Sequence, residues 1–157
     1  MSLEEIHMKE AIRLSFETMR NNNGGPFGAV VVKDGKIIAR GFNKVTLTND
    51  PTAHAEVVAI REACAALKDF QLTGCEIYTS CEPCPMCMAA IYWARPDKVY
   101  YANSKSDAAN IGFDDAYIYE QLELPYGERQ IPLQRIMAED AIKAFDEWLT
   151  KSDKTPY

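Results

Sequence analysis

The feature of this chain that most constrains its fold is the triplet His54-Ala55-Glu56, followed far along the chain by Pro83-Cys84-Pro85-Met86-Cys87. One imidazole and two thiolates form the ligand set of a zinc ion that keeps its fourth position open for water. Such a site exists only if the fold brings the two segments together. The zinc ion does not need a carboxylate as a further ligand, so Glu56 is free to carry protons.

The cysteine spacing alone also fits other kinds of site. A lone Cys-x-x-Cys is typical of redox pairs and of structural zinc sites, and Cys81 forms a second such pair with Cys84. A redox pair has no use for the upstream histidine and glutamate. A structural zinc site needs a fourth Cys or His at similar spacing, which the chain does not offer. We therefore favour a catalytic site with one zinc ion per chain, bound by His54, Cys84 and Cys87.

The composition predicts one globular domain. The chain has 157 residues, of which 47% are hydrophobic, and this is enough for a core. No segment approaches the length of an apolar membrane span, and the acidic, amphipathic N-terminal run is unlike a signal peptide. Five cysteines, an odd number, favour a reducing compartment. We expect a cytoplasmic protein with a single domain over residues 1–157.

The charge distribution argues against nucleic acid as a partner. The formal net charge is −6, and no two Lys or Arg residues are adjacent in the chain. Proteins that bind nucleic acid draw much of their affinity from Lys and Arg contacts to phosphates, and they usually show a basic patch. A small, uncharged free base fits this chain better as a substrate than tRNA or DNA.

The hydrophobic patterns predict alternating helices and strands. Ser2 is placed to cap a first helix, and Asp34-Gly35 is a typical hairpin turn between two strands. The predicted helices span 3–20, 53–67, 85–95, 117–122 and 140–150, and the predicted strands span 29–33, 36–41, 76–79, 98–102 and 133–138. This order predicts an α/β fold with helices on both faces of one five-stranded mixed sheet.

The predicted ligands lie at the starts of two helices. His54 and Glu56 are at the start of the second predicted helix, and Cys84 and Cys87 share a face at the start of the third. Helix N-termini stabilise negative charge, so both cysteines should favour the thiolate.

The motif resembles that of zinc-dependent nucleobase deaminases, for which H-x-E followed by P-C-x-x-C is typical. Over nearly its whole length the chain resembles the cytidine deaminase-like superfamily, and within it the small bacterial guanine deaminases. Finer matches distinguish this group from tRNA-adenosine deaminases, which usually have a small aliphatic residue at the position of Phe27 and lack the GFDD segment. These matches are GGPFGA at 24–29, NDPTAHAE at 49–56, SCEPCPMC at 80–87, AAIYWAR at 89–95, GFDD at 112–115 and the terminal Tyr157.

The resemblance implies a three-layer α/β/α sandwich and the hydrolysis of guanine to xanthine and ammonia. In that reaction a zinc-bound hydroxide attacks C2 of guanine, and Glu56 shuttles protons from the water to the ring and then to the departing amine. The resemblance also implies a homodimer in which the C-terminal helix and tail, residues 139–157, cross to the partner subunit.

The same resemblance, with the chemistry of the side chains, predicts the substrate contacts. Phe27 and Trp93 are flat and apolar enough to sandwich a purine. Asn43 offers an amide to the base edge, and Asp115 offers a carboxylate to a purine N–H. Tyr157 is expected to cover the base. A contact is also expected at Ala55, and further roles are possible for Glu82 and Asp114.

Other functions stay open at this point. The substrate could be another free base or amino-heterocycle, such as cytosine or ammeline. Deamination of tRNA adenosine is a third hypothesis, which the net charge and Phe27 disfavour. In a different class, the chain could be a zinc-stabilised binding protein without catalysis, but such a protein would gain nothing from Glu56.

Overall fold

The computed structural model describes residues 1–113 and 115–157. Two compact units divide the chain, the first from Met1 to Asp115 and the second from Ala116 to Tyr157. Asp114, a possible site residue in the sequence, lies outside the described residues. None of the described helices is both long and apolar enough to cross a membrane.

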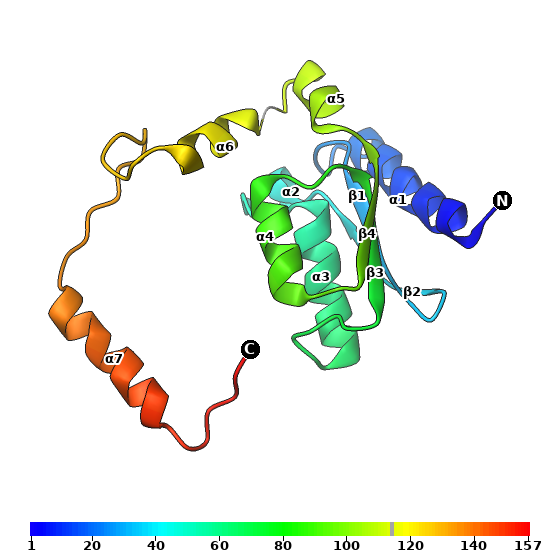
Figure 1. The fold of residues 1–157 in the computed structure, drawn as a ribbon. Helices are drawn as coiled ribbons and strands as arrows, with labels where there is room; N and C mark the ends of the chain where they lie inside the picture. Colours follow the sequence, from blue (N-terminus) through cyan, green and yellow to red (C-terminus); the bar gives the residue numbers. More distant parts are fainter. Residues whose placement is uncertain (114) are drawn as a thin grey trace. The chain divides into compact units, whose positions relative to one another are not determined.

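A four-stranded mixed sheet forms the centre of the first unit (Figure 1). Its strands are β1 (Gly28–Lys33), β2 (Lys36–Phe42), β3 (Cys75–Cys81) and β4 (Lys98–Asn103). They lie in the order β2-β1-β3-β4, with β1 antiparallel to both β2 and β3, and β3 parallel to β4. The predicted mixed sheet is thus confirmed, with one strand fewer.

The turn between β1 and β2 follows the predicted hairpin chemistry. Asp34 and Gly35 both have positive φ, 49° and 71°. Two such residues form the turn whose twist matches that of the flanking strands, and Asp-Gly is among the pairs that tolerate it best. Cross-strand pairing runs from Lys33↔Lys36 at the turn to Gly28↔Phe42 at the other end.

Helix α1 (Leu3–Arg20) covers one face of the sheet. It begins at the predicted cap, where Ser2 and Glu5 form a reciprocal capping box. One face of the helix packs against side chains of alternate sheet residues, forming a core cluster of Ala11, Leu14, Val30, Val32 and Tyr78. Because side chains alternate along a strand, the intervening residues face the opposite layer.

Helices α3 (Ala55–Leu67) and α4 (Pro85–Ala94) pack against that opposite face. The core between these helices and the sheet contains Ala29, Val31, Ala39, Ala55, Ala59, Ala63, Leu72, Cys75, Ile77, Ile91 and Ala94. Its many alanines allow the helix backbones to lie close to the sheet. The three-layer α/β/α arrangement is therefore present in the first unit.

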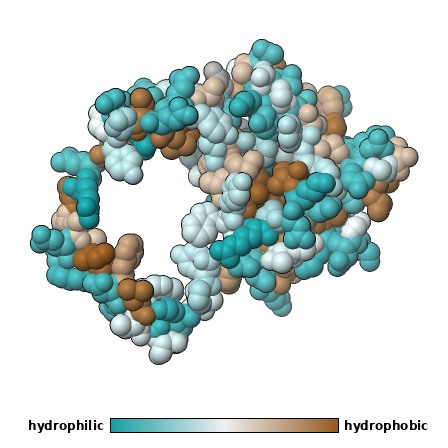
Figure 2. All heavy atoms as spheres, viewed as in Figure 1, coloured by the Kyte–Doolittle hydropathy of each residue, from teal (hydrophilic) through white to brown (hydrophobic). Residues whose placement is uncertain are grey.

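Two short helices in the first unit were not predicted, α2 (Val45–Thr48) and α5 (Lys105–Asn110). The second unit contains α6 (Ala116–Glu123) and α7 (Ala138–Thr150), both of which the sequence predicts within two residues at each end. No described side chain of the second unit is buried. Hydrophobic residues, brown in Figure 2, are exposed over the α7 segment.

The prediction of a fifth strand over residues 133–138 is wrong. Among the described residues, this segment pairs with no strand, and Ala138 already belongs to α7. Met137 has a positive φ of 51°, which interrupts an extended backbone just before the helix. The apolar alternation of the segment resembles a strand, but a strand forms only where a partner backbone is available.

Candidate functional site

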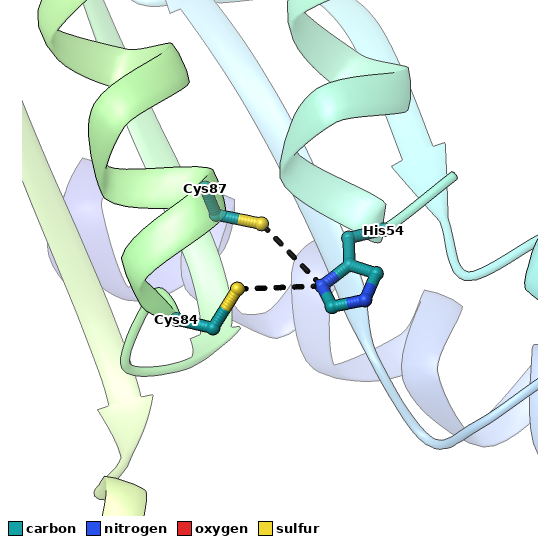
Figure 3. A group of neighbouring side chains, drawn as sticks. All are labelled: His54, Cys84 and Cys87. Carbon is teal, nitrogen blue, oxygen red and sulfur yellow. Dashed lines mark hydrogen bonds between the residues drawn. The ribbon is translucent and has the colours of Figure 1, made fainter. Parts of the chain in front are cut away.

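Three side chains from two segments that are distant in the sequence converge at the starts of α3 and α4 (Figure 3). His54 is the N-cap residue of α3, and Cys84 is the N-cap residue of α4. Pro85 follows in the first turn of α4, where its missing N–H costs nothing. Cys87, one turn into α4, points toward the same imidazole, as the sequence predicts.

The geometry of these three residues fits a tetrahedral zinc ion. The Nδ1 atom of His54 lies 3.5 Å from the Sγ atom of Cys84 and 3.5 Å from that of Cys87. Zinc bound at about 2.3 Å from sulfur and about 2.0 Å from nitrogen separates these atoms by about 3.5 Å. The three ligand atoms lie within 4.8 Å of one another. This set of one nitrogen and two sulfurs leaves one position of the tetrahedron for a further ligand.

The electrostatics of the ligands also favour a cation. Hydrogen bonds from Cys87 and His54 lower the pKa of the Cys84 thiol to about 4, so that this sulfur carries a negative charge at neutral pH. The hydrogen bond between Cys87 and Cys84 has the opposite effect on its other member, because it raises the pKa of the Cys87 thiol. The pKa of His54 is raised, mainly by its hydrogen bond to Cys84 and further by the charges of Glu56 and Asp115.

Glu56 is buried beside the ligands, with 6% of its surface exposed. Its Oε1 atom accepts a hydrogen bond of 3.1 Å from the Thr79 hydroxyl, and its Oε2 atom lies 3.4 Å from the Cys87 Sγ atom. Burial raises the pKa of this carboxyl, while the hydrogen bonds from Cys87 and Thr79 lower it. A buried carboxylate with a raised pKa is suited to accept and release a proton near neutral pH.

Asn43 follows the end of β2 and is also buried, 6% exposed. Its backbone N–H donates to the Phe27 carbonyl at 3.1 Å, which ties it to the loop before β1. Its side-chain Oδ1 atom accepts a hydrogen bond of 3.2 Å from the Val45 N–H. A backbone N–H needs an acceptor, so this contact fixes which way the amide is turned and leaves its N–H₂ group for another partner.

Phe27 is part of an aromatic pair that the sequence analysis did not assign. The Phe27 and Phe113 rings meet edge to face, with centroids 4.9 Å apart. Phe113 belongs to the GFDD segment, which was the one sequence signal that pointed to it. Asp115, two residues later, is close enough to the ligands for its charge to raise the pKa of His54.

The other predicted site residues lie in different surroundings. Ala55 is fully buried at the start of α3. The Glu82 carboxylate accepts a hydrogen bond of 3.0 Å from the Lys105 N–H at the start of α5. Trp93 is 64% exposed, and its position six residues after Cys87 puts it on another face of α4. Tyr157 belongs to the second unit. The substrate roles of these residues stay predictions.

A family model of the cytidine and deoxycytidylate deaminase zinc-binding region matches residues 1–103. These residues contain the three ligands, Glu56 and the whole sheet.

The chain is similar to guanine deaminases, in one case over 98% of its length. A guanine deaminase of Bacillus subtilis is 52% identical over 153 residues, covering 98% of each chain. An X-ray structure of guanine deaminase from Bacillus subtilis superposes with a TM-score of 0.95 and covers 98% of both chains. A guanine deaminase structure from Nitrosomonas europaea is 34% identical, with a TM-score of 0.66, over 69% of this chain and 63% of that one.

The similarity to tRNA-specific adenosine deaminases is shorter. The enzyme of Agrobacterium fabrum is 43% identical over 98 residues, which are 62% of this chain and 64% of that protein.

Proposed function

The chain belongs to the family defined by the cytidine and deoxycytidylate deaminase zinc-binding region, and from this premise we propose that it hydrolyses guanine to xanthine and ammonia. The observation that carries the proposal is the 52% identity to a guanine deaminase across 98% of both chains. The similarity to tRNA-specific adenosine deaminases covers less than two thirds of the chain. The net charge of −6 also favours a free base over an RNA.

His54, Cys84 and Cys87 hold the zinc ion of this family. When bound, the ion supplies Lewis-acid chemistry, which lowers the pKa of a water molecule in the open position to roughly 7. The protein residues around this position then determine which amino-heterocycle reacts.

Glu56 moves the protons of the reaction. Its carboxylate accepts a proton from the attacking water and delivers it to the ring nitrogen next to C2. It then accepts the second proton, from the hydroxyl group now on C2, and delivers it to the departing amino group while C2 becomes a carbonyl carbon. The bond between C2 and the exocyclic nitrogen breaks, and ammonia leaves. General acid–base catalysis of this kind contributes about 10²–10⁴-fold to a rate. The burial of Glu56 beside the ligands supports this role.

Base recognition combines aromatic and polar contacts. Phe27, supported edge-on by Phe113, contacts one face of the purine, and Trp93 contributes a second aromatic surface. Asn43 donates its N–H₂ group to an acceptor on the base edge, because Val45 already uses the amide oxygen. Asp115 accepts a hydrogen bond from a purine N–H.

The second unit supports a homodimer. Helix α7 places Ile142, Phe145 and Leu149 along one stripe, each at least 50% exposed. A stripe of this kind in a soluble protein normally packs against a partner. We infer that residues 139–157 pack on the partner subunit, where Tyr157 covers the bound base.

The five cysteines form no disulfide, which supports a reducing, cytoplasmic compartment.

A substrate screen tests the proposed function. The zinc-loaded protein is incubated with guanine, cytosine, adenine, cytidine and ammeline, and ammonia release is measured together with the ultraviolet spectrum. We expect efficient turnover of guanine, and we expect the KM for guanine to depend little on the salt concentration. Glu56→Gln, which keeps the shape of the side chain but carries no proton, should retain zinc and lose about 10²-fold or more in kcat.

The competing hypotheses predict different results. Editing of an RNA stem-loop without any activity on guanine would show a tRNA-adenosine deaminase, and its binding would weaken steeply with salt. Zinc binding without turnover of any base would show a non-catalytic protein. A Glu56→Gln variant with nearly normal kcat would remove Glu56 from the mechanism.

A further inference from the structure

Thr79 is the hydroxyl residue that contacts the proposed proton carrier. It lies in β3 and is 1% exposed. Its hydroxyl donates the 3.1 Å hydrogen bond to Oε1 of Glu56, across 23 positions of sequence. Hydrogen bonds to ionised groups are the stronger ones in proteins, and a buried contact is not weakened by competing water.

The strand alternation explains why Thr79 reaches Glu56 whereas its neighbour does not. Ile77 belongs to the core under α3 and α4, so Thr79, two residues later on β3, faces the same layer. Ser80 faces the other way and uses its Oγ atom to accept a hydrogen bond of 3.0 Å from the Gly28 N–H. Strand β3, an inner strand of the sheet, therefore places the Thr79 hydroxyl next to the Glu56 carboxylate at the start of α3.

The two carboxylate oxygens of Glu56 have different partners. Oε1 is held by the Thr79 hydroxyl, and Oε2 lies 3.4 Å from the Cys87 Sγ atom. Thr79 therefore holds one oxygen of the carboxylate, and the other oxygen lies on the side of Cys87.

We propose that Thr79 is a positioning residue of the deaminase reaction, whose hydroxyl anchors Oε1 of Glu56 so that Oε2 faces the reacting atoms. The inference rests on the proposed role of Glu56. A terminal carboxylate torsion is broad and has no single strongly preferred angle, so packing and hydrogen bonds must orient it. A proton carrier that is slightly misplaced loses much of its rate advantage, because proton transfer requires hydrogen-bond distance.

Two comparisons isolate the hydroxyl, Thr79→Val with the parent protein and Thr79→Ala with Thr79→Ser. Thr79→Val keeps the branched shape and removes the hydroxyl, whereas Thr79→Ser keeps the hydroxyl and removes a methyl group. We expect Thr79→Val to lower kcat by roughly 10- to 100-fold, with KM changed by less than about twofold. Thr79→Ser should stay within about threefold of the parent kcat. Zinc content should be unchanged in both variants.

Further variants keep the test decisive if Thr79→Val folds poorly. Thr79→Ala and Thr79→Ser both lack the methyl group and differ only in the hydroxyl, so their kcat ratio gives the same information. Thr18 on α1, 2% exposed, provides a control, because Thr18→Val makes the same change at another buried site and should keep kcat.

The proposal is overturned if Thr79→Val keeps kcat within twofold of the parent protein, or if the serine variant is as slow as the alanine variant. A parent protein that does not deaminate guanine would refute the proposed substrate alone. The two comparisons would then be made on the amino-heterocycle that the parent protein does deaminate. A parent protein that deaminates none would overturn both proposals.

Discussion

Several groups of the candidate site are held by contacts from residues that are not themselves reactive. The side-chain oxygen of Asn43 accepts a hydrogen bond from the Val45 N–H, and the backbone N–H of Asn43 donates one to the Phe27 carbonyl. A side chain on Gly24 would meet this residue as well, because a Cβ atom there would lie 2.5 Å from the Asn43 Oδ1 atom and close to its carbonyl oxygen. Gly24 is therefore needed for its lack of a side chain.

Gly24→Ala should weaken guanine binding, because the new methyl group displaces the Asn43 amide from the base edge. We expect KM to rise by about tenfold, which is the loss of roughly one hydrogen bond, with a smaller change in kcat. Steady-state kinetics measure both constants. Gly127→Ala is the matched control, because a Cβ atom at Gly127 meets nothing within 4 Å. An unchanged KM in Gly24→Ala would contradict the assignment of Asn43 to base recognition.

The metal ligands could be predicted from the sequence because their signal is local. His54 with Glu56, and Cys84 with Cys87, each lie within one helical turn, and their chemistry is specific. The contacts that hold Glu56 and Phe27 in place could not be predicted. Thr79 and Glu56 are 23 positions apart, and an isolated threonine in a strand has no distinguishing pattern. Phe113 likewise meets Phe27 only through the fold.

At the scale of elements, α1 is linked to the sheet by charge as well as by its apolar face. Glu10 on α1 accepts hydrogen bonds from Arg13 at 2.8 Å and from Arg40 on β2 at 2.7 Å. The hydrogen bond from Arg13, with a further contribution from Arg40, lowers the pKa of Glu10 to about 2. The pair with Arg40 connects residues that are 30 positions apart.

Glu10→Gln should lower the free energy of unfolding at pH 7 by about 0.5–1 kcal/mol, since the arginines are half exposed to water. The pKa of Glu10 is lower in the folded state, so its contribution is complete above the pKa of the unfolded chain, near 4.5. The contribution decreases as the pH falls toward 2. The stability difference between parent and variant should therefore shrink between pH 5 and about pH 2.

Urea unfolding at several pH values measures this difference. Glu17→Gln removes a pair with Arg13 that lies within α1, so it should cost less than Glu10→Gln. A difference for Glu10→Gln that stays constant down to pH 3 would contradict the proposed ionic link.

The elements that the sequence predicts well are those with local start and stop signals. The box of Ser2 and Glu5 and the Asp34-Gly35 turn define α1 and the hairpin between β1 and β2. Helices α2 and α5 are four and six residues long, too short for a helical period to emerge. The false strand at 133–138 has the opposite cause, because its local pattern suits a strand whereas pairing depends on distant residues.

At the scale of the whole molecule, the first unit has the two core clusters, and the second has no buried residue among those described. The second unit therefore lacks a core of its own to stabilise it, which is why a partner subunit is part of the proposed function. The sequence predicts the helices of this unit from their periodicity, but periodicity does not show what covers them.

Removal of Thr155 to Tyr157 should raise KM and lower kcat for guanine if Tyr157 covers the base as proposed, because water would then enter the site. Zinc content and thermal unfolding should change little, since these residues are all exposed. Kinetics, metal analysis and a melting curve of the truncated protein check the three expectations. An unchanged KM would show that the tail serves no site.

Mixed dimers test whether the tail acts on the partner. Inactive Glu56→Gln subunits and truncated subunits are combined under conditions that exchange subunits. One site of each heterodimer then has an intact Glu56 and an intact tail from its partner, so part of the activity should return. No recovery after verified exchange would restrict the tail to its own chain.

The placement of the metal ligands at helix starts also affects the stability of the fold. His54 and Cys84 are 30 positions apart, and an ion bound to both joins these two segments in the folded chain. The unfolded chain has no preformed site, so the free energy of binding the ion adds to the free energy of folding. Because α3 and α4 begin at these residues, the ion links the starts of two helices. Removal of the ion by a chelator would therefore lower the free energy of unfolding of the first unit and also abolish catalysis.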